Sequence, residues 1–162
     1  MTDRPRLNDL KDILELLYEK LGEFEKELII NSSKLAKFEL KQRIKREILP
    51  DIRKYETEYW ELYPQETIVI SDEEAETQLI KVEEAATSIE QIPSSTYPLE
   101  LISLLQEIRD KLNEPDKAAS AKLKVVLPLI PAIASYELEM ETEGLMYRTW
   151  KAIKGMVRRQ EV

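Results

Sequence analysis

Acidic side chains occupy every second position of the stretch YELEMETE, residues 136–143. Carboxylate oxygens are the ligands that hard cations such as Ca²⁺ prefer, so this spacing raises the question of a metal site. On a helix these side chains spread around the cylinder, and on a strand they share one face without a chelating turn. We therefore expect them to lie on a solvated surface and to bind no metal. They are Glu137, Glu139, Glu141 and Glu143.

The rest of the composition removes most other chemistry. The sequence contains no histidine and no cysteine, which excludes thiol nucleophiles, disulfides, zinc sites of the Cys/His type and catalytic triads based on imidazole. Only 3 glycines are present, so a glycine-rich phosphate-binding loop is disfavoured. An acid–base site made of Lys, Tyr and Glu alone ranks last among the hypotheses. We predict a protein that is not an enzyme and uses no cofactor.

A basic cluster and an aromatic cluster follow one another in the first half of the chain. Basic residues can contact phosphate or anionic lipid, and aromatic residues can stack on bases. Glutamates flank the basic cluster and no basic groove interleaves with the aromatic one, so a polar helix face and helix-end packing explain them better. The basic residues are Lys41, Arg43, Lys45 and Arg46. The aromatic residues are Tyr55, Tyr59, Trp60 and Tyr63.

The net charge of −8 is unevenly distributed along the chain. Residues 64–116 contain 3 basic and 13 acidic side chains, whereas residues 117–162 contain 8 basic and 5 acidic ones. Because the acidic middle repels phosphate backbones, we expect no nucleic-acid partner. The first ten residues lack the apolar core of a signal peptide and no disulfide can form, so we expect a cytoplasmic location.

Two long apolar seams predict an antiparallel, coiled-coil-like helical hairpin over residues 1–63. In both seams apolar residues recur mostly three or four positions apart, the spacing of one helix face. The second seam runs past Pro50, which predicts a kinked long helix. The first seam contains Leu7, Leu10, Leu14, Leu17, Leu21, Phe24 and Leu28. The second contains Leu35, Phe38, Leu40, Ile44, Ile48, Ile52, Tyr55, Tyr59 and Leu62.

After the hairpin, residues 64–71 predict an extended linker and residues 72–162 a small helical bundle. The sequence Ser-Asp-Glu-Glu at 71–74 predicts a capping box at the start of a helix. The β-branched run 67–70 and the alternating run 136–143 both lack a partner strand, so we expect no sheet. The predicted fold class is therefore all-α, with a helical hairpin followed by a helical bundle.

The most apolar stretch of the chain is KVVLPLIPAIAS, residues 124–135, which Pro128 and Pro131 interrupt. As a helix it would rise about 20 Å, short of the ~30 Å hydrocarbon core of a bilayer. The prolines would also leave backbone groups that lipid cannot satisfy. We therefore expect a protein-buried junction that ends one helix and directs the chain into the last one. Its expected core residues are Val126, Leu127, Ile130 and Ile133.

A final amphipathic helix is predicted over about 141–159. Such a helix can cap a bundle, or it can lie in a membrane interface with its apolar face in the lipid. A membrane surface is therefore the alternative partner. The apolar residues are Leu145, Met146, Trp150, Ile153 and Val157, and the basic residues are Arg148, Lys151, Lys154, Arg158 and Arg159.

Two stretches resemble parts of known helical modules. LYEKLGEFEKELIINSSKLAKFELKQRIKREI (Leu17–Ile48) is similar to helical hairpins of cyanobacterial multidomain proteins. LPLIPAIASYELEMETEG (Leu127–Gly144) is similar to a proline-broken segment near the ends of small helical modules. Both resemble the effector-associated, death-like adaptor modules of prokaryotic conflict and signalling systems. The resemblance implies attachment to switch ATPases, caspase-like proteases or TIR domains, and it supplies no catalytic residue.

The sequence as a whole therefore predicts a non-enzymatic helical interaction module. We expect it to assemble with itself or with a larger signalling protein, the alternative being a membrane-associating effector that acts through its C-terminal helix. The expected interaction residues are Leu10, Leu14, Leu17, Leu21, Phe24 and Leu28 in the first helix, together with Tyr59, Trp60, Leu127, Ile130 and Trp150.

Overall fold

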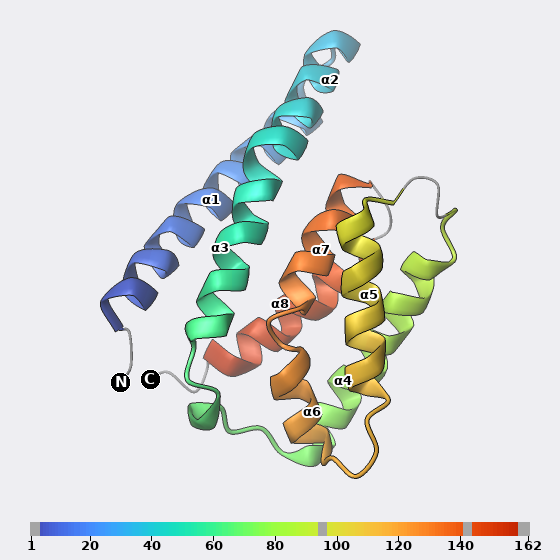
Figure 1. Cartoon of the computed structure of the whole chain (residues 1–162). Coiled ribbons are helices and arrows are strands. Elements are labelled where there is room, and N and C mark those ends of the chain that lie inside the picture. Colours follow the sequence, from blue (N-terminus) through green and yellow to red (C-terminus); the bar gives the residue numbers. More distant parts are fainter. Residues whose placement is uncertain (1–3, 94–96, 141–143, 159–162) are drawn as a thin grey trace. The chain divides into compact units, whose positions relative to one another are not determined.

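The computed structural model describes residues 4–93, 97–140 and 144–158, and all regular structure within these ranges is helical (Figure 1). The chain divides into two compact units, residues 1–63 and residues 64–162. The first is a helical hairpin and the second a helical bundle, so the predicted all-α fold class is confirmed.

Unit 1, residues 1–63, is a long hairpin. Helix α1 (Arg4–Ile30) forms one arm, and α2 (Lys34–Arg43), a π-helical turn (Ile44–Ile48) and α3 (Leu49–Leu62) return along it as the other (Figure 1). The turn at the tip ends at Ser33, whose Oγ accepts a hydrogen bond from the Ala36 N–H at 3.3 Å and so caps α2. The buried residues of α1 belong to the predicted first seam. They are Leu7, Leu10, Leu14, Leu21 and Phe24.

The interruption predicted at Pro50 takes the form of the π turn. A proline inside a helix has no N–H to donate and its ring clashes with the carbonyl one turn back. Here Leu49 donates its N–H to the carbonyl of Ile44, five residues earlier rather than four. The wider turn accommodates the proline, and the helix continues into α3 without a break.

The π turn also changes which residues of α2 face α1. One residue of an α-helix turns the chain by about 100°, so an extra residue in one turn rotates everything before it by that angle. Leu40 and Ile48 are buried, whereas Leu35 and Phe38 are exposed. The prediction that Leu35 and Phe38 belong to the buried seam is therefore wrong, because the predicted kink at Pro50 leaves the α-helical spacing unchanged, whereas the π turn shifts it by one residue.

Unit 2, residues 64–162, begins with a segment that was expected to be extended throughout. It starts instead with a 3-10 turn, Gln65–Thr67, and is extended only after it. Ser71 then caps the next helix as predicted, because its Oγ accepts the Glu74 N–H at 3.1 Å. The Glu74 carboxylate accepts the Ser71 hydroxyl, also at 3.1 Å, in place of the backbone N–H that would complete a capping box. The helices after it are α4 (Asp72–Glu90), α5 (Leu99–Leu112), α6 (Ala119–Val126), α7 (Ile130–Glu139) and α8 (Leu145–Arg158).

Helix α4 is the helix on which most of this bundle is built. It packs against α5, α6 and α8, while α7 packs against α5 and α8. Three of its six buried residues are alanines, Ala75, Ala85 and Ala86, and such small side chains let neighbouring helices approach closely. All seven acidic residues of this helix are exposed, together with Thr77, Ile80, Lys81 and Thr87. One helix therefore supplies both core and charged surface.

The proline-broken segment lies in the core of unit 2. Helix α6 ends at Val126 and α7 begins at Ile130, with Pro131 in the first turn of α7, where its missing N–H leaves no hydrogen bond unmade. Leu127 and Ile133 are buried with these two helix ends, so the predicted burial of the junction is confirmed. The chain leads from it into α7, however, and not directly into the last helix, α8. No single helix in the described ranges is long and apolar enough to cross a membrane, and α6 and α7 meet that criterion only as a pair bent by 55°.

The first prediction compares two leucines of α1 that differ mainly in burial. Leu14 is 1% exposed and Leu16 is 67% exposed. We expect Leu14→Ala to lower the free energy of unfolding by about 2–5 kcal/mol, because it leaves a cavity beside α3. Leu16→Ala should change it by no more than ~0.5 kcal/mol. Urea denaturation followed by circular dichroism measures both free energies of unfolding. Equal losses would contradict the assignment of Leu14 to the buried seam.

Candidate functional site

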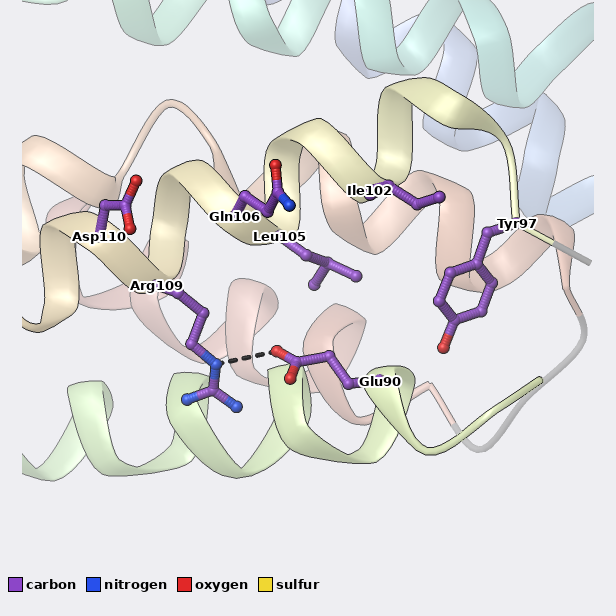
Figure 2. A pocket seen from close by; sticks show the side chains of 7 residues that line it. All are labelled: Glu90, Tyr97, Ile102, Leu105, Gln106, Arg109 and Asp110. Atoms are coloured by element: carbon purple, nitrogen blue, oxygen red, sulfur yellow. Dashed lines mark hydrogen bonds and ion pairs between the residues drawn. The ribbon is translucent and has the colours of Figure 1, made fainter. Parts of the chain in front are cut away.

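A pocket of about 590 Å³ lies in unit 2 beside the end of α4 and along α5 (Figure 2). Its floor is apolar, and its walls carry two carboxylates, a guanidinium, an amide and a phenol. A pocket with these groups can hold a small molecule by apolar contact and a few hydrogen bonds. The lining residues are Glu90, Tyr97, Ile102, Leu105, Gln106, Arg109 and Asp110.

Arg109 forms one wall of the pocket and links α5 to α4. Its Nε donates to Glu90 Oε1 at 2.8 Å, and its Nη2 donates to Thr87 Oγ1 at 2.6 Å (Figure 2 draws the first contact). Its Nη1 also lies 3.5 Å from Glu83 Oε1. The guanidinium therefore meets two carboxylates of α4, and the contact serves to join the two helices.

Tyr97 closes the other end of the pocket. Its hydroxyl is buried and makes no hydrogen bond with any described residue. Burial raises the pKa of the Tyr97 phenol, and the nearby Glu90 charge raises it further. The Ile92 backbone opposes this rise, although its geometry falls short of a hydrogen bond. A phenol held in its neutral form is a poor general base. The pocket therefore suits binding better than proton transfer.

A second polar feature is Glu137, which was expected from the sequence to lie on a solvated surface. Its side chain is only 2% exposed, so that prediction is wrong. Its Oε2 accepts the Met146 N–H and its Oε1 accepts the Tyr147 N–H, both at 3.0 Å. These donors are among the first N–H groups of α8, which have no partner inside their own helix. Glu137 therefore caps α8 from α7.

The electrostatics of this cap combine a cost and a gain. Burial raises the pKa of Glu137, whereas the two backbone N–H groups and the charge of Arg148 oppose the rise. Gly144 leads into α8 with φ of 74°, which other residues rarely adopt, so the connection requires glycine here. Among the other predicted surface glutamates, Glu139 is half-buried, and Glu141 and Glu143 lie outside the described residues.

Glu56 is a buried carboxylate in unit 1 that was not predicted as a functional or structural site. Its side chain is fully buried, and it accepts hydrogen bonds from the Tyr18 hydroxyl at 2.8 Å and from Trp60 Nε1 at 3.3 Å. It thereby joins α1 to α3. Glu56 lies four residues from both Ile52 and Trp60, which places it on the apolar face of α3. This spacing is the sequence signal from which its burial could have been predicted.

No metal centre emerges from these carboxylates. In residues 4–93, 97–140 and 144–158, no group of three or more acidic side chains is arranged to hold a metal ion. The carboxylates of Glu56 and Glu137 instead accept hydrogen bonds from protein donors, as buried charged groups generally do.

The most unusual surface of unit 1 is the tip of the hairpin. Four large apolar side chains, Ile29, Ile30, Leu35 and Phe38, lie at the end of α1 and the start of α2, and we call them the tip surface. They are exposed to between 59% for Phe38 and 83% for Ile29. The adjoining segment 34–46 has 6 basic residues and 1 acidic residue. An exposed apolar cluster beside concentrated charge is typical of an interaction surface.

Most of the interaction residues expected from the sequence are not on such a surface. Leu17 and Leu28 are half-buried, and the remaining nine are buried. In this structure the nine buried residues stabilise the fold. The buried ones are Leu10, Leu14, Leu21, Phe24, Tyr59, Trp60, Leu127, Ile130 and Trp150.

The apolar face of the C-terminal helix is also occupied. Helix α8 packs against α4 and α7, and Met146, Trp150, Ile153 and Val157 are buried. The face that was expected to be available to a membrane is thus covered by protein.

Comparisons with protein-family models, with curated proteins and with solved structures find no match to this chain. The class that the fold defines is an all-helical protein made of a hairpin and a helical bundle. The resemblance to effector-associated adaptor modules stays a prediction.

The second prediction concerns the pH dependence of stability through Glu137. A carboxyl whose folded pKa lies above its ordinary value of 4.5 contributes stability that is fully present below that value and is lost as the pH rises through the folded pKa. We therefore expect the free energy of unfolding of the wild type, minus that of Glu137→Gln, to be largest in acid and to decrease as the pH rises. Urea denaturation at a series of pH values between about 4 and 8 measures it.

At neutral pH Glu137→Gln should itself be destabilising by about 1–3 kcal/mol, because an amide presents an NH₂ to one of the two backbone donors. The matched control is Glu139→Gln, two residues along α7, which we expect to change stability by less than ~0.5 kcal/mol. A pH-independent difference between wild type and Glu137→Gln would contradict the direction of the pKa shift.

Proposed function

We propose that this chain is a non-enzymatic helical interaction module. It assembles with itself or with a larger signalling protein, in the cytoplasm of a prokaryotic signalling or defence system. The observation that carries the proposal is the tip surface, four large apolar side chains that the chain leaves in water. Full burial of one such side chain is worth about 1.5–3 kcal/mol, so a partner that covers the tip gains considerable free energy.

The position of the tip surface supports this role. It is presented on two paired helices, α1 and α2, which hold its side chains in place before any partner arrives. Binding to a preorganised surface avoids much of the ordering cost of association. Self-association was expected through the α1 seam, but most of those leucines are buried, so we place the contact at the tip.

The competing functions have less support. The pocket beside α5 combines a neutral phenol with an arginine already engaged by carboxylates, which offers little acid–base chemistry. The membrane-associating effector requires a free apolar face on α8, and that face is covered. The adaptor function is therefore the one we retain.

The third prediction tests the tip directly. We expect Leu35→Ser combined with Phe38→Ser to weaken self-association by at least about tenfold, which corresponds to ~1.4 kcal/mol of lost contact. Sedimentation equilibrium over a range of concentrations measures the association. Both side chains are exposed, so circular dichroism and the melting temperature should change little.

The control for this experiment is Leu99→Ser, which removes an exposed leucine from α5, outside the tip surface. It should leave association unchanged. Two results together would show that the proposed function is wrong. The first is that the wild type does not self-associate. The second is that the partners crosslinked to the wild type in lysate are also crosslinked to the tip variant.

A further inference from the structure

The exposed face of α4 is acidic with one apolar residue at its centre. Helix α4 contains 7 acidic residues and 1 lysine. Ile80 lies on its outer side, with Glu76 four residues before it and Glu84 four residues after it, and all three are exposed. Neither carboxylate forms an ion pair with any described residue. We call these three residues the α4 acidic face.

The start of α2 has the same pattern with the opposite charge. Phe38 is exposed, Lys34 lies four residues before it and Lys41 three residues after it, so all three share one side of the helix. In an antiparallel crossing, Phe38 would lie on Ile80, Lys34 near Glu84 and Lys41 near Glu76. Apolar contact at the centre and opposite charges on both sides are what a specific interface requires.

We propose that the tip surface of one copy of the chain docks on the α4 acidic face of a second copy. The argument is charge complementarity between segment 34–46, with 6 basic residues and 1 acidic residue, and α4, with 7 acidic residues and 1 basic residue. Two of those acidic residues, Glu83 and Glu90, are already paired with Arg109, so the contact uses Glu76 and Glu84. This inference rests on the proposed function and names its partner. It also brings together two exposed apolar centres, Phe38 and Ile80, each of which gains by leaving water.

A bilayer is the less suitable occupant of the tip. Anionic lipid would attract the basic residues of segment 34–46, but it would repel Glu23, Glu25 and Glu27, which are exposed on the last turns of α1, close to the tip in sequence. The acidic face of α4 would also remain without a role. A second copy of the chain would cover the tip surface and the α4 acidic face in one contact.

The contact has a definite symmetry. Each copy offers a tip and an acidic face, so the interface is head to tail and a docked pair leaves one tip and one acidic face free. Assembly therefore continues beyond the dimer unless the ring closes. Because the charged pairs are exposed, salt should weaken it.

The experiment uses two full-length variants, each lacking one surface. The first is Leu35→Ser with Phe38→Ser, which removes the apolar tip. The second is Glu76→Lys with Glu84→Lys, which reverses the acidic face. We expect the wild type to assemble beyond the dimer, and each variant alone to be a monomer of 19.0 kDa by light scattering after gel filtration. An equimolar mixture should form a discrete dimer, because the intact tip of one variant binds the intact face of the other.

The control for charge is Glu66→Lys with Glu107→Lys, two exposed glutamates outside the α4 acidic face. It changes the net charge equally and should assemble like the wild type. Assembly of the wild type should weaken at least tenfold between about 50 and 500 mM salt, an interval of one decade in ionic strength.

Three results would overturn the inference. If the face-reversed variant still dimerises while the tip variant does not, the contact is tip to tip, and the proposed function stands without this interface. If the mixture stays monomeric, the two surfaces do not meet. If the wild type remains a monomer but pellets through its tip with phosphatidylcholine–phosphatidylserine vesicles, the occupant is a membrane, and both the inference and the proposed self-assembly are wrong.

Discussion

One buried carboxylate, Glu137, determines where the last helix of unit 2 begins. Its two oxygens take the N–H groups of Met146 and Tyr147, which would otherwise be unsatisfied inside the protein. With its start fixed, α8 packs its apolar side against α4 and α7. Burial disfavours the charged form of this carboxyl and raises its pKa, and the positive end of α8 and the two backbone donors offset only part of that cost. The arrangement of α4, α7 and α8 depends on this contact.

Helix α6 is also capped by a carboxylate from another helix, here at an exposed position. Asp72, the first residue of α4, accepts the Ser120 N–H at 3.0 Å, and this hydrogen bond is the main reason that the pKa of Asp72 is lowered. Helix α4 therefore has three separate tasks. Its alanines admit neighbouring helices closely, its first residue caps one of them, and its outer side carries the charge that we assign to a partner.

Elements whose signals are local could be predicted from the sequence. The seam of α1, the helix cap at Ser71 and the junction around Pro131 all follow from spacing or from the chemistry of one residue type. The burial of Glu137 could not be predicted, because its partners lie nine and ten residues away and meet it only after α7 and α8 pack. The predicted interaction residues are apolar, and the same apolar pattern is typical of both a core and a contact surface. Nine of the eleven are buried, whereas Phe38, which the spacing placed in the buried seam, is exposed.

The π turn at Ile44–Ile48 gives the hairpin a property that no single side chain provides. In an uninterrupted α-helix, Phe38 would lie about 40° around the helix axis from the buried Ile52. With one extra residue in the turn, it lies about 140° from Ile52. The sequence of α2 is thus compatible with two phases, and the hydrogen-bond register of this turn decides which is used. A change of the turn from π to α geometry at unchanged chain length would rotate Lys41 inward with Phe38 and turn Leu40 out. Deletion of one residue from the turn would instead keep the present phase, because Phe38 and Ile52 would then be 13 residues apart in an uninterrupted helix, again about 140° around its axis.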